Sequence, residues 1–306
     1  MEYRGAMRLA SVFGPLFLSG LVFAGLLGSS CGDSGSGGGS ATTGADATFE
    51  GGVVRSRTTY KSTAQGPLDL YVYATERAGD ELRPAVVLFH GGRWEEGHPK
   101  QFQSQCIRLA QRGMLAISAD YRVELTHGTS PVEAVMDAKS AIRWVRDNAD
   151  RLGVDPNRVA AGGGSAGGHI ASAAATIPEV SEGDSETSAR PDALVLFSGL
   201  VDMTPRTGLG YAKLGEAAIK VSPLHHLDGD EPPTLILHGR FDDVASLESV
   251  QLFSDRLKAS GVECELVIYE AGHGFFNEFN DSKAFADTLK RMEGFFEGLG
   301  WIRAAQ

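Results

Sequence analysis

A serine between closely spaced glycines, in the segment GGSAG at residues 163–167, is the first residue pattern that could perform chemistry. The segment follows a short apolar run that ends near Ala161, and it opens a helical pattern over residues 170–175. In such a strand, turn and helix context the glycines permit a tight turn from which the serine hydroxyl projects. The following helix N-terminus offers positive potential to a developing oxyanion. The pattern therefore predicts that Ser165 is the nucleophile of an acyl-transfer site.

A nucleophilic serine needs a base and an acid that orients the base, and both have candidates after later apolar runs. The run at residues 234–237 leads into HGRFDD, which contains Asp242 and Asp243, and the run at residues 263–269 leads into AGHGFF, which contains His273. The chain order of serine, acid and histidine is the order that a strand-borne nucleophile of this type requires. We expect His273 to be the base and one of the two aspartates to be the acid.

Alternating apolar runs and helical patterns predict the elements that position these residues. Strands are expected at residues 85–89, 115–119, 159–161, 193–197, 234–237 and 263–269. Helices are expected at residues 101–112, 132–149, 246–259 and 283–299. Continuously apolar strands separated by helices indicate a mostly parallel central sheet flanked by helices on both faces.

Residues 67–300 resemble the hormone-sensitive-lipase-like and acetylesterase branch of the α/β hydrolases. The motifs that carry the resemblance are HGG at residues 90–92, DYR at 120–122, the helix from Asp137 to Trp144, GGGSAGGH at 162–169, HGRFD at 238–242 and AGHGFF at 271–276. The resemblance implies an α/β-hydrolase fold and hydrolysis of carboxylic esters without a metal or an organic cofactor. Only residues 202–227 are left over between the nucleophile and the acid, so we expect no large cap domain.

The same resemblance assigns further roles around the serine. Related esterases carry an HGGG-type loop whose N–H groups complete an oxyanion hole, which implies Gly91, Gly92 and Ala166 here. Arg93 departs from the pattern, because the family often has a third glycine at that position. Asp242 is preferred to its neighbour Asp243, because it ends an H-G-x-x-D element similar to the acid loop of related esterases.

Other residues near these motifs have simpler interpretations beside the functional ones. Trp94 and Phe275 are candidates for the substrate pocket, although aromatic residues near strand ends are as often packing residues. His169 shares a helix face with Ser165, where packing or hydrogen bonding is the better interpretation. His225 and His226 lack acidic or cysteine partners at ligand spacing, so no metal site is expected.

The N-terminus predicts export. Residues 1–31 carry Arg4 and Arg8, an apolar stretch shorter than the roughly 20 residues of a bilayer span, and a lipobox-like segment that ends at Cys31. Residues 32–52 are rich in Gly, Ser and Thr and are expected to form a flexible tether, which leaves residues 53–306 as the catalytic domain. We therefore expect a lipoprotein of the bacterial cell envelope, attached to the membrane only through a lipid on Cys31. The alternative is an ordinary signal peptide and a secreted or periplasmic protein.

Composition restricts the other functional classes. The chain has 306 residues, of which 42% are hydrophobic and 22% are charged, as in soluble globular proteins. A formal net charge of -11 argues against a nucleic-acid partner, and three cysteines are too few for a disulfide framework. The expected function is a serine esterase acting on short-acyl esters of small molecules or carbohydrates. A serine peptidase of the same fold and a catalytically inactive lipid-anchored binding protein are the alternatives. The oligomeric state is not indicated.

Overall fold

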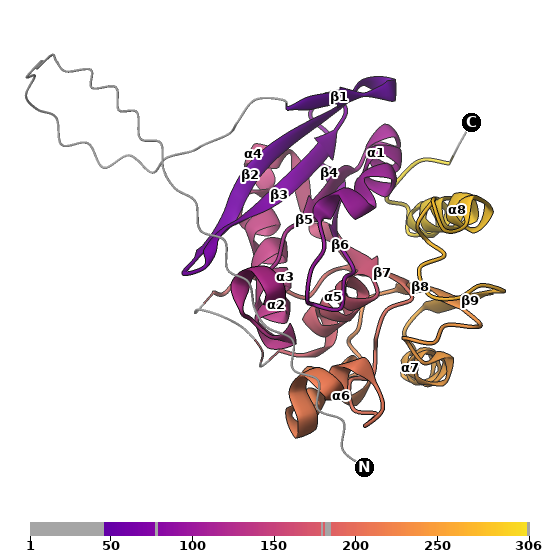
Figure 1. Cartoon of the computed structure of the whole chain (residues 1–306). Coiled ribbons are helices and arrows are strands. Elements are labelled where there is room, and N and C mark those ends of the chain that lie inside the picture. The colour runs from indigo at the N-terminus through magenta and orange to yellow at the C-terminus, as the bar shows by residue number, and fades with distance from the viewer. Residues whose placement is uncertain (1–45, 77–78, 179, 181–184, 305–306) are drawn as a thin grey trace, which may run out of the picture. The chain divides into compact units, whose positions relative to one another are not determined.

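A single mixed sheet organises the catalytic part of the chain. The computed structural model describes residues 46–76, 79–178, 180 and 185–304, and within them nine strands form the order β1-β2-β3-β5-β4-β6-β7-β8-β9 (Figure 1). The strands are β1 Ala47–Phe49, β2 Val53–Thr63, β3 Gly66–Ala74, β4 Arg83–Phe89, β5 Leu115–Ala119, β6 Val154–Gly164, β7 Ala193–Phe197, β8 Thr234–Gly239 and β9 Cys264–Tyr269. Three pairs are antiparallel: β1 with β2, β2 with β3, and β3 with β5. The other five pairs are parallel: β5 with β4, β4 with β6, β6 with β7, β7 with β8, and β8 with β9.

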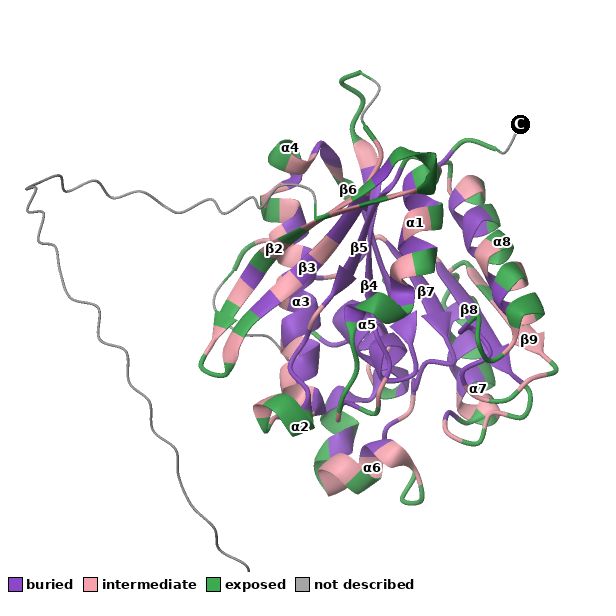
Figure 2. Ribbon diagram, turned by 45° about the horizontal axis from the view of Figure 1, so that its top comes forward, coloured by how far each residue is buried: buried purple, intermediate pink, exposed green. Residues whose placement is uncertain are grey.

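Helices cover both faces of this sheet, so its middle strands are buried on both sides (Figure 2). α3 Pro131–Asp147, α4 Ala149–Leu152, α5 Ala166–Thr176 and α7 Leu247–Ala259 contribute to one hydrophobic cluster. α1 Gln103–Gln111 and α8 Ser282–Gly298 contribute to the cluster on the other face. Along β4, Ala85, Val87 and Phe89 enter the first cluster, whereas Val86 and Leu88 enter the second. This alternation is the geometric reason why a parallel strand covered on both faces is apolar at every position.

Local sequence signals fix the start of the longest helices. Ser130 accepts a hydrogen bond from the Val132 N–H, Glu133 accepts one from the Ser130 N–H, and Pro131 occupies the first helical position of α3. Such a capping box satisfies N–H groups that the first helical turn leaves without partners. Asp281 caps α8 in the same manner through the Ala284 N–H.

The sequence-based prediction of a mostly parallel sheet flanked by helices is confirmed, and β5 and β7 have the predicted bounds. The prediction missed the antiparallel strands β1, β2 and β3. In β2 polar residues mask the strand pattern, because only Val53 and Tyr60 of VVRSRTTYKST are buried. β3 instead has an alternating pattern, in which Leu68, Leu70 and Val72 are buried.

The predicted boundary of the tether is wrong at its C-terminal end. Residues 47–52 were assigned to the tether, but Ala47–Phe49 pairs with Val53–Arg55 of β2, and Glu50–Gly52 forms the 3-10 helix η1 between them. Backbone hydrogen bonds to an existing strand edge order this segment despite its small residues. The remaining part of the tether, the signal segment and Cys31 lie outside the described residues.

Short elements replace a cap domain after β7. The segment 202–227 contains only three short helical elements, which are α6 Leu209–Leu214, η3 Gly215–Val221 and η4 Pro223–His225. As predicted, there is no large cap domain in this segment. Two further short helices, α2 Glu124–His127 and η2 Pro99–Phe102, lie in connections before β6. Within the part of the chain that the structure describes, no helix is long and apolar enough to cross a bilayer.

Candidate active site

Ser165 occupies a strained turn between the end of β6 and the start of α5. Its backbone has φ 55° and ψ -119°, which an L-residue adopts only where the surroundings impose it. The Ser165 N–H donates to the Phe197 carbonyl of the neighbouring strand β7 at 2.9 Å, which holds the turn at the sheet edge. Glycine is required beside it, because a Cβ on Gly163 would lie 2.4 Å from the Phe89 carbonyl oxygen, and one on Gly167 would lie 2.0 Å from the same atom.

Two other post-strand loops bring a histidine and an aspartate to this serine. The His273 Nε2 atom lies 2.9 Å from the Ser165 hydroxyl oxygen, and its Nδ1 atom lies 2.9 Å from both carboxylate oxygens of Asp242. The loops follow β9 and β8, which are parallel neighbours and therefore end at the same edge of the sheet as β6. Serine, imidazole and carboxylate thus form one continuous line of hydrogen bonds.

The environment of Asp242 keeps it charged. Its carboxylate is buried, and burial alone would raise its pKa. The hydrogen bond with His273 and the N–H groups of Ala245 and Val244, which lie 2.8 and 2.9 Å from Oδ1, outweigh burial and lower the pKa of Asp242. Asp243, the rival candidate from the sequence, is exposed, and the described structure has no hydrogen bond between it and His273. The geometry therefore favours Asp242.

Two further histidines, His238 and His90, are buried in the loops around the site. His238 is buried beside Asp242, with Nε2 3.1 Å from the Ala245 carbonyl oxygen, and burial lowers its pKa. His90 stacks on Tyr121 with ring centroids 4.3 Å apart, and burial lowers the pKa of His90 to about 4. A lowered pKa makes each of these rings a weaker base, and within the described structure the ring nitrogens contact the Gly91 and Ala245 carbonyls rather than the Ser165 hydroxyl.

The predicted oxyanion hole needs one correction. The Gly91 N–H donates to Oε1 of Gln101 at 2.6 Å, so it is already used within the protein. The N–H groups of Gly92 and Ala166 have no acceptor among the described residues, and they are the donors left for a ligand. Gly92 has φ 124°, and a Cβ there would lie 1.9 Å from the Glu96 carbonyl oxygen, so only glycine fits this loop. Arg93 follows with φ 61° and an exposed side chain.

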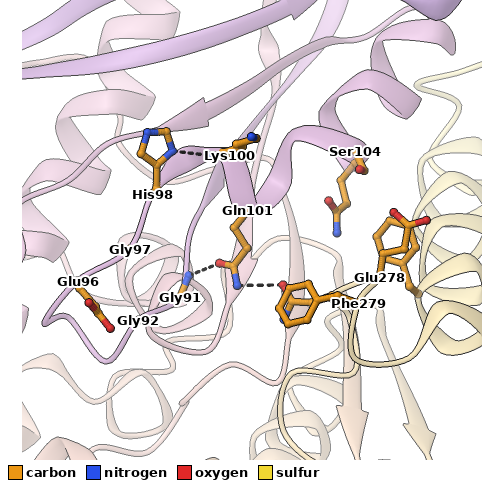
Figure 3. A pocket seen from close by; sticks show the side chains of 13 residues that line it. Gly91, Gly92, Glu96, Gly97, His98, Lys100, Gln101, Ser104, Glu278 and Phe279 are labelled. Atoms are coloured by element: carbon orange, nitrogen blue, oxygen red, sulfur yellow. Dashed lines mark hydrogen bonds between the residues drawn. The ribbon is translucent and has the colours of Figure 1, made fainter.

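Two cavities border the site. The Gln101 cavity, of about 690 Å³, adjoins the loop after β4 (Figure 3) and is lined among others by Gly91, Gly92, His98, Lys100, Gln101 and Phe279. The Asp243 cavity, of about 620 Å³, adjoins the acid loop and is lined among others by Arg93, Leu200, Asp202, Leu209, Asp243 and Val244.

The expectation that Trp94 and Phe275 line the substrate pocket is wrong. Trp94 is 1% exposed and packs edge-on against the buried His169 at 5.1 Å, and Phe275 is 2% exposed and packs on Tyr269 at 4.6 Å. Neither lines the Gln101 cavity or the Asp243 cavity. Both aromatic rings were close to the site in sequence, but the loops turn them into the core.

The remaining histidines have structural partners. The His169 Nε2 atom lies 2.6 Å from the Val221 carbonyl oxygen, and burial lowers the pKa of His169 to about 4, in line with the packing interpretation. His225 contacts the Ser222 hydroxyl at 2.9 Å and His226 the Ile219 carbonyl at 2.8 Å. Across the described ranges no group of three or more His, Cys, Asp and Glu side chains is placed to hold a metal ion.

Sequence reasoning overlooked two side chains at the site, Gln101 and Asn277. Gln101 Nε2 donates to Oδ1 of Asn277 at 3.0 Å, and Asn277 Nδ2 donates to the Gly274 carbonyl, next to His273. No motif marks either residue, because an amide in a loop has no characteristic spacing.

Comparison with known proteins agrees with this geometry. The family model described as BD-FAE matches residues 68–257. Esterase LipC of Mycobacterium tuberculosis is 33% identical over 221 residues, which are 63% of this chain and 53% of that protein. The isoprenylcysteine alpha-carbonyl methylesterase ICME of Arabidopsis thaliana is 32% identical over 241 residues, 71% of this chain and 55% of that protein. The chain thus spans about half the length of these curated relatives.

A solved structure extends the similarity over a whole relative. The propionate-bound esterase Est2 of Thermogutta terrifontis is 38% identical with a TM-score of 0.77, and the match covers 82% of this chain and 96% of that one. The likeness therefore covers nearly the whole of that esterase and most of this chain.

Proposed function

Because this chain belongs to the BD-FAE family of α/β hydrolases, we propose that it is a serine carboxylesterase in which Ser165, His273 and Asp242 act as a triad. The observation that supports this most directly is the line of 2.9 Å contacts from the Ser165 hydroxyl through His273 to Asp242. The relatives named as esterases support the same class of reaction.

The reaction proceeds in two steps. The Ser165 oxygen forms a bond to the ester carbonyl carbon while His273 Nε2 takes the serine proton, and that proton then passes to the departing alkoxide as the ester C–O bond breaks. Water repeats the sequence on the acyl-enzyme and releases the acid. Asp242, ionised and held by two backbone N–H groups, orients the imidazole and stabilises its cation.

The carbonyl oxygen gains negative charge in both steps, and the free N–H groups of Gly92 and Ala166 are the donors proposed for it. Backbone donors that are fixed before the reaction stabilise the charge without reorganisation. A single donor of this kind is typically worth about 2.7 to 4 kcal/mol of the barrier.

We further propose that the acyl group is short, such as acetyl. α6 forms one wall of the Asp243 cavity through Leu209, and Lys213 on α6 forms ion pairs with Glu95 at 2.7 Å and with Glu124. These ion pairs connect α6 to the segments that follow β4 and β5. A long acyl chain in the Asp243 cavity would have to displace α6. The related Thermogutta esterase has been solved with propionate and with butyrate, which are short acids. An ester of a carbohydrate or of another small alcohol would place its alcohol part in the Gln101 cavity.

The function is tested with p-nitrophenyl esters of increasing chain length and with a matched peptide amide panel. The expected result is turnover of the acetyl ester, a fall in kcat/KM from butyrate to octanoate, no amide hydrolysis, and no activity for Ser165→Ala. Hydrolysis of the amides would indicate the peptidase alternative. Lack of turnover on every ester, together with no labelling of Ser165 by a fluorophosphonate probe, would indicate a binding protein.

For its location we propose an exported lipoprotein of the bacterial cell envelope that is anchored at Cys31. The support is the sequence alone, a lipobox-like segment followed by a Gly/Ser-rich stretch. Cys31→Ser should abolish lipidation and move the protein out of the membrane fraction. An unmodified N-terminal peptide in the wild-type protein would show that the anchor proposal is wrong.

A further inference from the structure

We infer that Gln101 is a positioning residue, which couples the loop carrying the oxyanion donors to the loop carrying His273. The inference rests on the proposed function, because it concerns the alignment of that reaction's own groups. It follows from a directed chain of side-chain hydrogen bonds that joins Gly91 to Gly274 through Gln101 and Asn277.

The first link fixes the oxyanion loop. Gln101 lies in η2, where its own N–H donates to the His98 carbonyl at 3.0 Å, so its backbone is anchored. Its side chain reaches back and accepts the Gly91 N–H at 2.6 Å (Figure 3). A Cβ on Gly91 would lie 3.1 Å from the Gly164 carbonyl oxygen, so this loop packs directly on the nucleophile turn. The peptide that follows Gly91 carries the Gly92 N–H, and its direction depends on how Gly91 is held.

The second link fixes the histidine loop. Gln101 Nε2 donates to Asn277 Oδ1 at 3.0 Å, and Asn277 Nδ2 donates to the Gly274 carbonyl at 3.0 Å. Asn277 is 9% exposed, and its backbone N–H donates to the same Gly274 carbonyl. Gly274 directly follows His273 and has φ 83°, so the loop turns sharply at this point. The amides of Asn277 and Asn280 therefore both bind the turn that presents the imidazole, and of these two it is Asn277 that connects it to Gln101.

The chain of hydrogen bonds works in one direction only. The Gly91 N–H is a donor, so Gln101 must present its oxygen to it and its nitrogen to Asn277. Asn277 must then present its oxygen to Gln101 and its nitrogen to Gly274. A side chain that lacks either a donor or an acceptor breaks the connection, whereas the Ser165, His273 and Asp242 side chains are untouched by the change. Gln101 lines a cavity and is exposed there, so replacing it removes the link without opening the hydrophobic core.

The test compares Gln101→Met, which keeps the length but no hydrogen bond, with Asn277→Ala, the double variant and the control Gln111→Met, which loses a bond to the Glu50 carbonyl and lines neither cavity of the site. Kinetics on p-nitrophenyl acetate are recorded with thermal unfolding of each protein, and Ser165→Ala is included. We expect each single variant to lower kcat about tenfold and to keep KM within about twofold of wild type. The reason is that the variants disturb the alignment of the oxyanion donors and His273, which affects the transition state more than the binding of substrate. The double variant should be no slower than the slower single variant, because one connection is broken in all three. Gln111→Met should match the wild type.

The outcomes separate this inference from the proposed function. Wild-type kcat in Gln101→Met, a raised KM with unchanged kcat, or losses that multiply in the double variant would each overturn the positioning role. If Asn277→Ala unfolds at a markedly lower temperature, the kinetics of Gln101→Met alone test the inference. Gln101 is exposed in the cavity, so we expect its replacement to leave the protein folded. If Ser165→Ala remains active, the proposed function itself is wrong, whatever the Gln101 variant does.

Discussion

Replacing Asp242 with asparagine should disable the enzyme by reversing a tautomer rather than by disturbing the fold. Oδ1 of Asp242 accepts the N–H groups of Val244 and Ala245, and these two donors will keep an oxygen at that position in the asparagine. The new NH2 group then replaces Oδ2 and competes with the retained Oδ1 for Nδ1 of His273, because both positions lie 2.9 Å from that atom. To accept from the NH2 group, the imidazole must carry its proton on Nε2, which leaves no lone pair for Ser165.

The size of the effect follows from this loss of the base. A triad with the wrong imidazole tautomer loses about 10³- to 10⁴-fold in kcat, equivalent to roughly 4 to 5.5 kcal/mol of barrier. Shape and buried hydrogen bonds are preserved, so thermal unfolding should change far less than activity. The lowered pKa of Asp242 means that the wild-type side chain is a carboxylate at neutral pH, so the comparison is between a charged and a neutral group.

The assay is kcat for p-nitrophenyl acetate at about pH 7.5, which lies above the reference histidine pKa of about 6.5. Asp243→Asn is the matched control, because Asp243 is exposed and adjacent, and it should stay within about twofold of wild type. A loss of less than about tenfold in Asp242→Asn would refute the tautomer argument. A large loss in Asp243→Asn would show that the acid had been placed one residue out.

Two more predictions concern the buried histidine and the oxyanion loop. Burial lowers the pKa of His169 from 6.5 to about 4, so the unfolded chain binds a proton there that the folded one does not between those values. The free energy of unfolding should therefore fall as the pH drops from 6.5 to about 4, by an amount on the order of 3 kcal/mol for this group. His169→Gln should make Tm depend less on pH over this range. An equal pH dependence of Tm in the variant and in the wild type would contradict the prediction. Gly92→Ala should lower kcat at least about 100-fold, because its Cβ meets the Glu96 carbonyl at 1.9 Å and displaces an oxyanion donor. Gly113→Ala, with φ 91° but open space around its Cβ, is the control for backbone strain, and an equal loss of activity in both would count against the clash.

Local sequence determined the frame of this protein. The strands β4, β5, β6, β7 and β8 were recognisable because continuous apolar runs reflect burial on both faces of a parallel sheet. The sequence also indicated β9, although this edge strand is not fully buried. Ser165 could be identified because a strained turn between a strand and a helix tolerates only small neighbours, and that requirement appears within five consecutive residues. The order of the remaining site residues follows from the order of the strands, since parallel strands deliver their loops to one edge.

Tertiary structure decided what depends on contacts between distant residues. The choice between Asp242 and Asp243 turns on which carboxylate is buried against His273, 31 positions away. The use of the Gly91 N–H by Gln101, and the link from there to Asn277, 176 positions further along the chain, left no trace in local sequence because hydrogen bonds between loops have no period.

Side-chain direction was equally inaccessible to sequence. Trp94 follows the oxyanion loop and looked suited to a pocket, yet its φ of 59° turns the ring toward His169 and into the core. The strand β2 was missed for a related reason, because a strand near the edge of the sheet buries few side chains and needs no continuous apolar run to form. Sequence thus specified which loops meet at the site, and packing specified which atoms in those loops face one another.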